Sequence, residues 1–314
     1  MKIHRWLAVV AFFAVACGAT AAHAQTLTLA YHQGDAYKYG LHAVFNSEIS
    51  GAVSTPIALD MTAQEAVTVV SVDSSGDADV SVTTSDLSVT SSMGTIKTTT
   101  SGLPGQTVTM TIAPDGRVLM VDGQPFAGTG LAAVSGTGGS FISAVLPSDA
   151  VKPGDTWSKT YNIANPGGTG SVDVKADSTY LRDETIKGVG AAVVETKSDT
   201  TFNLTLDLSK IVGGANPLPN MPGRGGSPSE ISGPPTPEAG PQSITVTGTG
   251  KADTTSWVDP SSHRIVKTHQ TGSTNANLTF QMAAGSTAPT TTPTAPAITP
   301  TTIAATFTLD LTPV

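Results

Sequence analysis

Four of the six histidines, those that follow residue 24, are the first candidates for chemistry, because imidazole binds metals and carries protons near neutral pH. They are His32, His42, His263 and His269. None lies in a His-Glu-x-x-His run, and no Cys or acidic ligand sits at a matching spacing. Duplicated units could bring the two pairs together in a His-rich metal site. We predict instead that these are surface or strand-end histidines and that the protein has no metal site.

Three acidic residues, Asp73, Asp77 and Asp79, superficially resemble a calcium loop. The alternating spacing of such a loop is missing, and no Glu follows at its twelfth position. A solvated hairpin turn explains these residues better. The acidic pair Asp183-Glu184 is also predicted to lie in a turn, where solvation is the usual reason for such pairs.

No catalytic set is visible in the sequence. There is no Gly-x-Ser-x-Gly elbow, and no Ser has recognisable neighbours for activation by His and a carboxylate. The glycine run at 128–133 matches a relaxed dinucleotide fingerprint but lacks the strand–helix context that such a site needs. We therefore predict a non-enzymatic protein with no catalytic residues and no cofactor.

Charge is scarce in this chain. Only 13% of the 314 residues are charged, against about a quarter in an ordinary globular protein. The formal net charge is −8, which argues against a nucleic-acid partner because such partners need a basic face. One Cys rules out a disulfide framework and Cys-rich metal sites.

The first 24 residues read as a signal peptide. Lys2 and Arg5 precede an apolar run that is too short to span a bilayer. A small-x-small site predicts cleavage between Ala24 and Gln25, and no later run approaches transmembrane length. The mature chain is expected to be periplasmic or secreted. Cys17 follows small residues, as in a bacterial lipobox, so a lipid-anchored protein of the outer envelope is the alternative.

The rest of the chain predicts an all-β protein. Hydrophobic and polar residues alternate with period two at 107–112, 203–208 and 306–311, and hairpins are expected at 67–82 and 107–121. Such alternation is typical of antiparallel strands with one wet face. One short helix is expected near 140–147, because four apolar residues have i, i+4 spacing before Pro147. We expect this helix to cover the sheet with Phe141, Ile142, Val145 and Leu146.

Two similar blocks divide the mature chain. Gly34-Asp35-Ala36-Tyr37 opens one, and Gly154-Asp155-Thr156-Trp157 opens the other 120 residues later. We therefore divide the chain into a first β unit at 25–146 and a second at 147–282. A Pro/Gly-rich insert at 213–242 and a Thr/Pro-rich loop at 283–300 are expected to be disordered, and 301–314 to form a terminal strand that completes the sheet. Chance similarity within a β meander remains the alternative explanation of the two blocks.

Short turn motifs carry two resemblances. Trp257-Val258-Asp259-Pro260 resembles a hairpin of the bacterial lipoprotein carriers, which form a curved antiparallel half-barrel. The Gly-Asp-x-aromatic openers and the Pro114-Asp115-Gly116-Arg117 turn resemble an uncharacterised family of secreted bacterial β proteins. The resemblance to the lipoprotein carriers implies a curved antiparallel sheet or half-barrel, and no family active site comes with either resemblance. Together with the two similar blocks, this predicts a half-barrel built from two related units.

A curved sheet has a concave apolar face, on which a hydrophobic molecule would be held by area burial and few polar contacts. We therefore expect a monomeric binding or carrier module for a hydrophobic or lipid-like molecule of the bacterial envelope. The alternative is a structural or interaction module of the envelope or surface. It would display its Thr/Ser-rich strands to a protein or polysaccharide.

Overall fold

The computed structural model describes thirteen strands and no helix in seven segments of the chain. The segments are 24–51, 54–103, 105–125, 144–165, 168–207, 241–282 and 301–314. The strands are β1 (Ala36–Ser50), β2 (Thr55–Val72), β3 (Ala78–Met93), β4 (Ile96–Leu103), β5 (Gln106–Ile112), β6 (Val118–Val121), β7 (Gln124–Pro125), β8 (Thr156–Ala164), β9 (Gly168–Ile186), β10 (Val189–Asp207), β11 (Pro241–Asp259), β12 (Arg264–Met282) and β13 (Thr301–Pro313).

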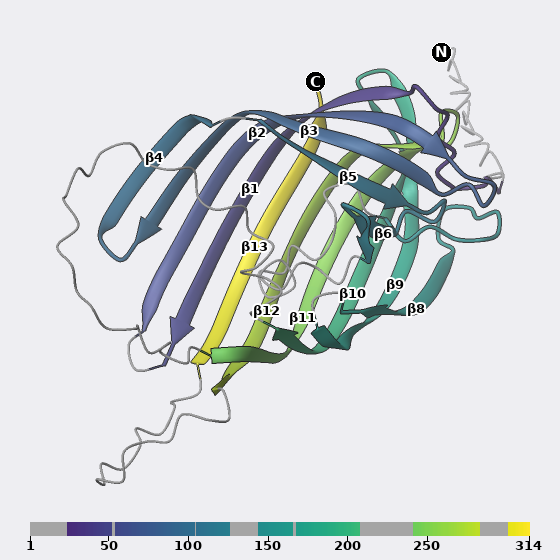
Figure 1. Ribbon diagram of the computed structural model, residues 1–314. Coiled ribbons are helices and arrows are strands. Elements are labelled where there is room, and N and C mark those ends of the chain that lie inside the picture. The colour runs from purple at the N-terminus through teal and green to yellow at the C-terminus, as the bar shows by residue number, and fades with distance from the viewer. Residues whose placement is uncertain are drawn as a thin grey trace, which may run out of the picture.

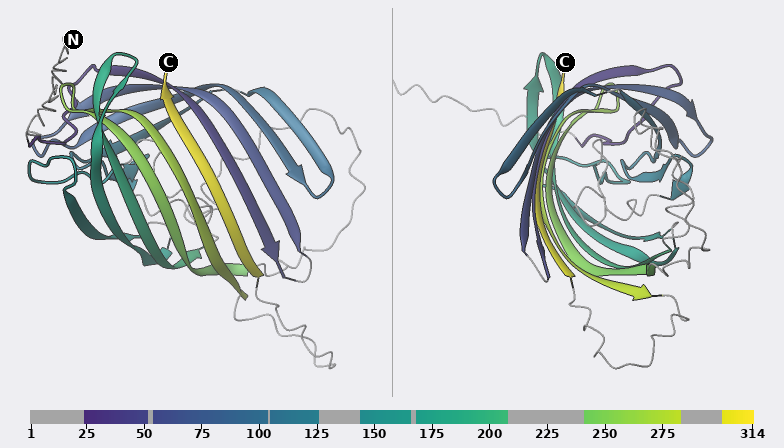
Figure 2. Two further views of the ribbon diagram at one scale, coloured as in Figure 1. Left: turned by 180° about the vertical axis from the view of Figure 1, so that it is seen from behind. Right: turned by 60° about the vertical axis from the view of Figure 1, so that its left-hand side comes forward.

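All of these strands belong to one antiparallel sheet that curls into an open half-barrel (Figure 1, Figure 2). The order is β7-β6-β5-β3-β2-β1-β13-β12-β11-β10-β9-β8. The remaining strand, β4, pairs with residues 87–93 of β3, whereas β5 pairs with residues 78–84 of the same strand. The predicted fold class is therefore confirmed, and so are the two predicted hairpins. The predicted terminal strand corresponds to β13. It lies in the middle of the sheet between β1 and β12, so both halves of the chain form one continuous sheet.

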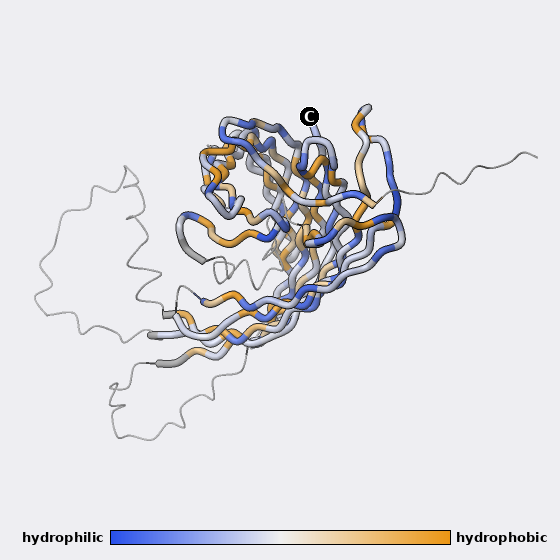
Figure 3. The backbone as a smooth tube through the Cα atoms, turned by 90° about the vertical axis from the view of Figure 1, so that its right-hand side faces the viewer, coloured by the Kyte–Doolittle hydropathy of each residue, from blue (hydrophilic) through white to orange (hydrophobic). Residues whose placement is uncertain are grey.

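One face of the sheet is buried and apolar, as the alternation predicts. On β1 the buried residues Tyr39, Leu41 and Ala43 alternate with exposed or half-buried ones, and β13 repeats this with Phe307, Leu309 and Leu311. Figure 3 shows the same alternation of hydrophobic and hydrophilic residues along the strands. We call the side that carries these buried residues the inner face, and its opposite the outer face.

The two Gly-Asp openers adopt the same turn. Gly34 and Gly154 have positive φ angles of 91° and 96°, which favour glycine. In each turn the Asp side chain accepts a hydrogen bond from the backbone N–H three residues earlier, at 2.9 Å. Each Gly N–H donates to a carbonyl of a neighbouring strand, Val69 O or Tyr180 O. This shared geometry agrees with two related units, which stay a prediction.

The predicted short helix is wrong for the part of it that the structure describes. Residues 144–147 have no helical structure. The Val145 carbonyl accepts hydrogen bonds from the Trp157 indole at 2.8 Å and from the Ser178 hydroxyl, and the Leu146 N–H donates to Asp115 O. The apolar spacing fits an extended segment equally well, because neighbouring strands rather than the segment itself supply its hydrogen-bond partners.

The β5–β6 turn is tied to the opposite edge of the sheet by side chains. The Asp115 carboxylate in this turn accepts hydrogen bonds from Arg117 at 2.8 Å and from Lys159 of β8. The Arg117 guanidinium also lies 5.2 Å from the ring centre of Tyr161 on β8. Burial alone would raise the pKa of Asp115, but the Lys159 and Arg117 hydrogen bonds lower it. The two open edges are thus joined at one end without a backbone ladder.

Asn substitution at Asp115 tests this closure. Asp115→Asn leaves the ammonium of Lys159 without its carboxylate, so we expect a loss of about 1–3 kcal/mol in unfolding free energy. Hydrogen exchange should also accelerate in β8 and at 144–151. The control Asp177→Asn removes an exposed partner of Lys175 and should cost less than about 0.5 kcal/mol in urea melts. Equal effects of the two substitutions would contradict the closure.

Glycines on the inner face leave room for aromatic rings. A Cβ at Gly272 would lie 2.4 Å from the Phe307 ring, which also stacks against Phe45. A Cβ at Gly248 would lie 2.6 Å from Phe202. The backbone of β11 and β12 therefore needs these glycines if the two rings are to pack flat on the inner face.

We expect Gly272→Ala to lower the unfolding free energy by about 1–3 kcal/mol, because Phe307 must leave its position. Gly190→Ala is the matched control, since a Cβ there meets nothing within 4 Å. Urea unfolding of both variants measures the difference. If Gly272→Ala were as stable as the control, the proposed role of the glycine would be wrong.

Candidate functional site

The inner face continues as an apolar wall beyond the main core. A second cluster of buried residues covers β9 to β12 and comprises Val172, Val174, Phe202, Leu204, Leu206, Val246 and Ala276. Half-buried Ile303 of β13 packs against it. On the first half of the sheet, Leu59 of β2 pairs with Phe45 of β1, and Leu59 remains 36% exposed. The wall therefore runs across both halves and presents apolar side chains that are not fully covered.

A band of buried polar side chains crosses the second half of this wall. Ser178, Thr196, Thr254 and Gln270 pair in register across β9, β10, β11 and β12, and all four are buried. The Ser178 and Thr196 hydroxyls are hydrogen-bonded at 2.9 Å. The same cross-strand row continues from Gln270 through Leu309 of β13, Ala43 of β1 and Met61 of β2, which are all apolar. This row of the inner face is thus apolar on β13, β1 and β2, and lined by hydroxyls and one amide on β9 to β12.

Glu65 is the buried acidic side chain of the inner face. It pairs with Tyr39 across β1 and β2, is only 2% exposed, and its Oε2 has no hydrogen-bond partner. Burial raises the pKa of Glu65 from its ordinary value to about 7. A carboxyl group in this position changes charge near neutral pH, which an ordinary surface Glu does not do.

Tyrosines and one arginine surround this part of the inner face. The Tyr39 hydroxyl donates a hydrogen bond to Ile265 O at 2.7 Å, which links β1 to β12 across the end of β13. The Arg264 guanidinium lies 4.9 Å from the ring centre of Tyr37, and the Tyr37 hydroxyl donates to Asp35. Burial raises the pKa of Tyr39 to about 12, so this phenol stays protonated at physiological pH.

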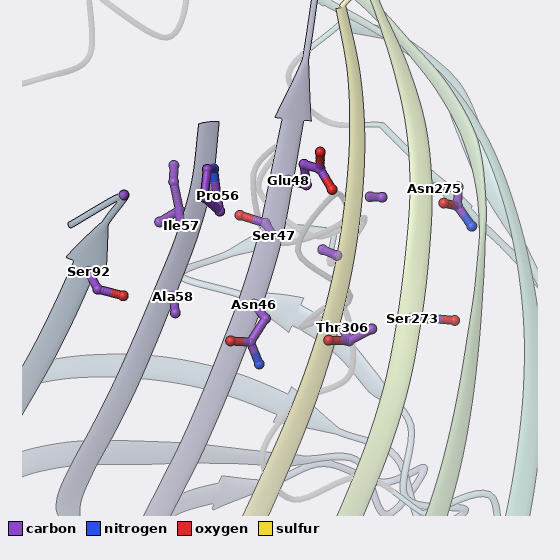
Figure 4. Close-up of a pocket in the computed structure, with 13 residues that line it drawn as sticks. Asn46, Ser47, Glu48, Pro56, Ile57, Ala58, Ser92, Ser273, Asn275 and Thr306 are labelled. Carbon is purple, nitrogen blue, oxygen red and sulfur yellow. The ribbon is translucent and has the colours of Figure 1, made fainter. Parts of the chain in front are cut away.

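A pocket of about 420 Å³ opens on the outer face (Figure 4). Its polar lining comes from four strands, β1, β3, β12 and β13, and Pro56, Ala58 and Ala304 add an apolar part. Amides, hydroxyls and one carboxylate make up the polar part: Asn46, Glu48, Ser92, Ser273, Asn275 and Thr306. These groups can form hydrogen bonds with an uncharged polar partner.

The four histidines within the described segments are exposed or partly exposed. On the outer face His42 contacts Asp60 at 3.1 Å and His269 contacts Asp310 at 2.7 Å. His263 sits in the β11–β12 turn next to Thr28 O, and His32 precedes the first opener. Among the described residues, no group of three or more His, Cys, Asp or Glu side chains is placed to hold a metal ion.

The other acidic candidates have structural roles. Asp73 accepts hydrogen bonds from the N–H groups of Ser75 and Asp77 in a hairpin turn. The prediction of a turn at Asp183-Glu184 is wrong, because both residues lie in β9 and the turn follows at Lys187 and Gly188. The β9–β10 ladder has a bulge at Leu181 and then continues in register through Asp183 and Glu184 to Ile186.

The Trp-x-Asp-Pro segment stabilises its hairpin. The Trp257 indole donates to Glu184 at 2.6 Å, and the Lys267 ammonium lies 4.2 Å from the Trp257 ring centre. Asp259 accepts hydrogen bonds from the backbone and hydroxyl of Ser261 and from the Ser262 hydroxyl. These contacts account for the motif without any catalytic role.

The predicted site residues are only partly within the described segments. Cys17, Phe141 and Ile142 lie outside them. Val145 and Leu146 are buried, and Leu146 belongs to the main core. Gln25, next to Ala24, exchanges two backbone hydrogen bonds with Val151. Cleavage and lipidation therefore stay predictions. No helix in the described segments is long and apolar enough to cross a membrane.

Two comparisons of the sequence with known proteins found no match. No protein-family model matches the chain, and no curated protein matches its sequence. The resemblances to lipoprotein carriers and to an uncharacterised secreted family therefore stay predictions, although the half-barrel that they imply is present.

Sequence reasoning missed Glu65 and the buried polar band. The signal for Glu65 was present, because Ala63, Glu65, Val67 and Val69 alternate with period two and place the Glu among apolar inner residues. The band carried a weaker signal, since Thr is common on both faces of these strands.

We expect Glu65→Gln to make the protein more stable at pH 8 than the natural sequence. The raised pKa of Glu65 means that its contribution is fully present below about pH 4.5 and is lost as the pH rises through about 7. The shift corresponds to about 3 kcal/mol at pH 8. Urea unfolding at pH 5 and pH 8 should show a gain from Glu65→Gln that shrinks toward pH 5.

Glu195→Gln is the control for this prediction. Glu195 is partly exposed and pairs with Lys197 at 3.5 Å, so its substitution should change stability little at either pH. A Glu65→Gln variant that is less stable than the natural protein at pH 8 would show that the ionised carboxylate is well solvated or paired.

Proposed function

We propose that this protein is a non-enzymatic binding or carrier module for a hydrophobic or lipid-like molecule, working in the periplasm or as a secreted protein. The observation that supports it best is the curved inner face, whose apolar wall extends past the main core onto β9–β12. Half-buried and exposed apolar side chains such as Phe45, Met61 and Leu59 remain on that wall. A long apolar molecule laid along this wall would complete their burial.

Native and denaturing mass spectra of the mature protein, purified from its own host, test the proposal. We expect a non-covalent adduct of lipid size that is lost on denaturation. The mature N-terminus is read in the same spectra, which shows whether the chain begins at Gln25 or at a lipidated Cys17. A clean unliganded mass, together with no binding of the lipophilic dye Nile red, would exclude a carrier.

A matched pair of variants locates the binding face. Leu59 and Val70 are both exposed apolar residues of β2, but Leu59 belongs to the inner face and Val70 to the outer face. Leu59→Ser should weaken Nile red binding by roughly two- to fivefold, because covering a third of a Leu side chain is worth about 0.5–1 kcal/mol. Val70→Ser should leave binding unchanged. Equal effects would place the dye elsewhere.

The second candidate function is an interaction module of the cell envelope. The outer pocket favours it, since amides and hydroxyls from four strands meet there beside small apolar residues. Such a surface suits an uncharged polar partner such as a polysaccharide. If the inner face binds no lipophilic molecule, this second function becomes the better explanation of the structure.

A further inference from the structure

The turn between β3 and β4 exposes two large apolar side chains that lie next to each other. Gly94 and Thr95 form this turn, and Gly94 has a positive φ angle of 59°. Met93 and Ile96 pair across it and are 57% and 70% exposed. A single exposed apolar residue is ordinary, but two that pair at the end of a hairpin form a patch. We call residues 93–96 the hairpin tip, and Figure 1 shows β4 at the outer left of the sheet.

The apolar side chains of the hairpin tip belong to the inner face. Met93 pairs with Ile57 of β2, which is half-buried. Two residues farther along β2, Leu59 is 36% exposed and pairs with half-buried Phe45 of β1. We call these four residues, together with Ile96, the apolar strip. It leads from the hairpin tip to the apolar wall on which the proposed function depends.

The charges around the hairpin tip suit an anionic partner. Between Asp86 and Asp115 the only charged residue is Lys97, which follows Ile96 and is exposed. This stretch therefore carries a positive charge within a chain whose formal net charge is −8. Residues 98–101 are all Thr or Ser, whose hydroxyls can donate hydrogen bonds to phosphate and ester oxygens. An anionic lipid surface offers an apolar interior, phosphates and ester oxygens together.

We infer that the hairpin tip docks on an anionic lipid membrane, with Met93 and Ile96 among the acyl chains and Lys97 at the phosphates. The inference rests on the proposed function and adds where the carrier meets its cargo. A lipid-like molecule is nearly insoluble in water, so a carrier must collect or deliver it at a membrane. The apolar strip gives such a molecule a path between the membrane and the inner face.

The size of the hairpin tip indicates weak and reversible docking. Even a whole myristoyl chain gives a protein only marginal membrane binding, and two apolar side chains bury less than such a chain. One lysine near an anionic surface adds a further modest contribution. A carrier has to leave the membrane after loading, so reversible contact of this kind agrees with the proposed function.

Flotation with lipid vesicles tests the docking, using the chain that starts at Gln25 so that no lipid anchor at Cys17 contributes. One set of vesicles is pure phosphatidylcholine, and the other contains about a third phosphatidylglycerol. At physiological ionic strength, charges more than about 8 Å from the surface are largely screened, so the acidic rest of the chain contributes little. We expect binding to both sets, about fivefold tighter on the anionic vesicles.

Matched variants connect vesicle binding to the hairpin tip. Ile96→Ser should weaken binding about tenfold, because most of an isoleucine side chain loses its burial. Val70→Ser is its control, since Val70 is 50% exposed on the outer face near the opposite end of β2. Lys97→Gln should abolish the preference for anionic vesicles, whereas Lys38→Gln removes the same charge from an exposed position of β1 and should not. Urea unfolding of all four variants controls for folding.

The outcomes separate the docking from the carrier function. A protein that binds Nile red but neither set of vesicles would overturn the docking and leave the carrier function standing. Absence of Nile red binding would overturn the carrier function, whatever the vesicles show. Vesicle binding that survives Ile96→Ser would overturn the placement at the hairpin tip. Sedimentation velocity completes the test: a dimer that Ile96→Ser dissociates, without vesicle binding, would show that a second copy covers the tip.

Discussion

The pairing of β13 with both β1 and β12 is the interaction on which the rest of the structure depends. The two halves of the chain are each a meander of neighbouring strands, and the last strand joins them along its full length. Without it, β1 and β12 would be two open edges, each with a row of unpaired backbone groups. With it, Leu309 and Leu311 continue the buried rows of β1 into β12, so both halves share one core.

Bulges, glycines on the inner face and one side-chain closure together determine the shape of the inner face. Bulges in the β2–β3, β9–β10 and β11–β12 ladders increase the local twist and bend the sheet. The glycines of β11 and β12 let Phe202 and Phe307 lie flat against the backbone. The β5–β6 turn, through Asp115, and the extended segment at 144–146 fasten one end of the curl. The opposite end keeps apolar side chains partly uncovered.

Much of this fold could be predicted from the sequence, because period-two alternation specifies both a strand and the face that it buries. The strand order could not be predicted, since nothing in residues 301–314 says that they pair between β1 and β12. The predicted helix was wrong at 144–147, the described part of it, because i, i+4 apolar spacing does not distinguish a helical turn from an extended segment with partners on both sides. Glu65 matches no known spacing of catalytic residues, and its signal in the sequence is a single acidic residue at an inner position.

The buried polar groups argue that the inner face is more than a core. A core selected for stability alone would place an apolar residue where Glu65 stands, because burial of an ionisable group without a partner is destabilising. Apolar residues do occur at comparable positions of the inner face. The cross-strand row that contains the hydroxyl band continues as Leu309 of β13, Ala43 of β1 and Met61 of β2. The exposed histidines and aspartates of the outer face, by contrast, pair with one another in solvent at little cost. The costly polar groups therefore concentrate on the side where a ligand of the half-barrel would lie.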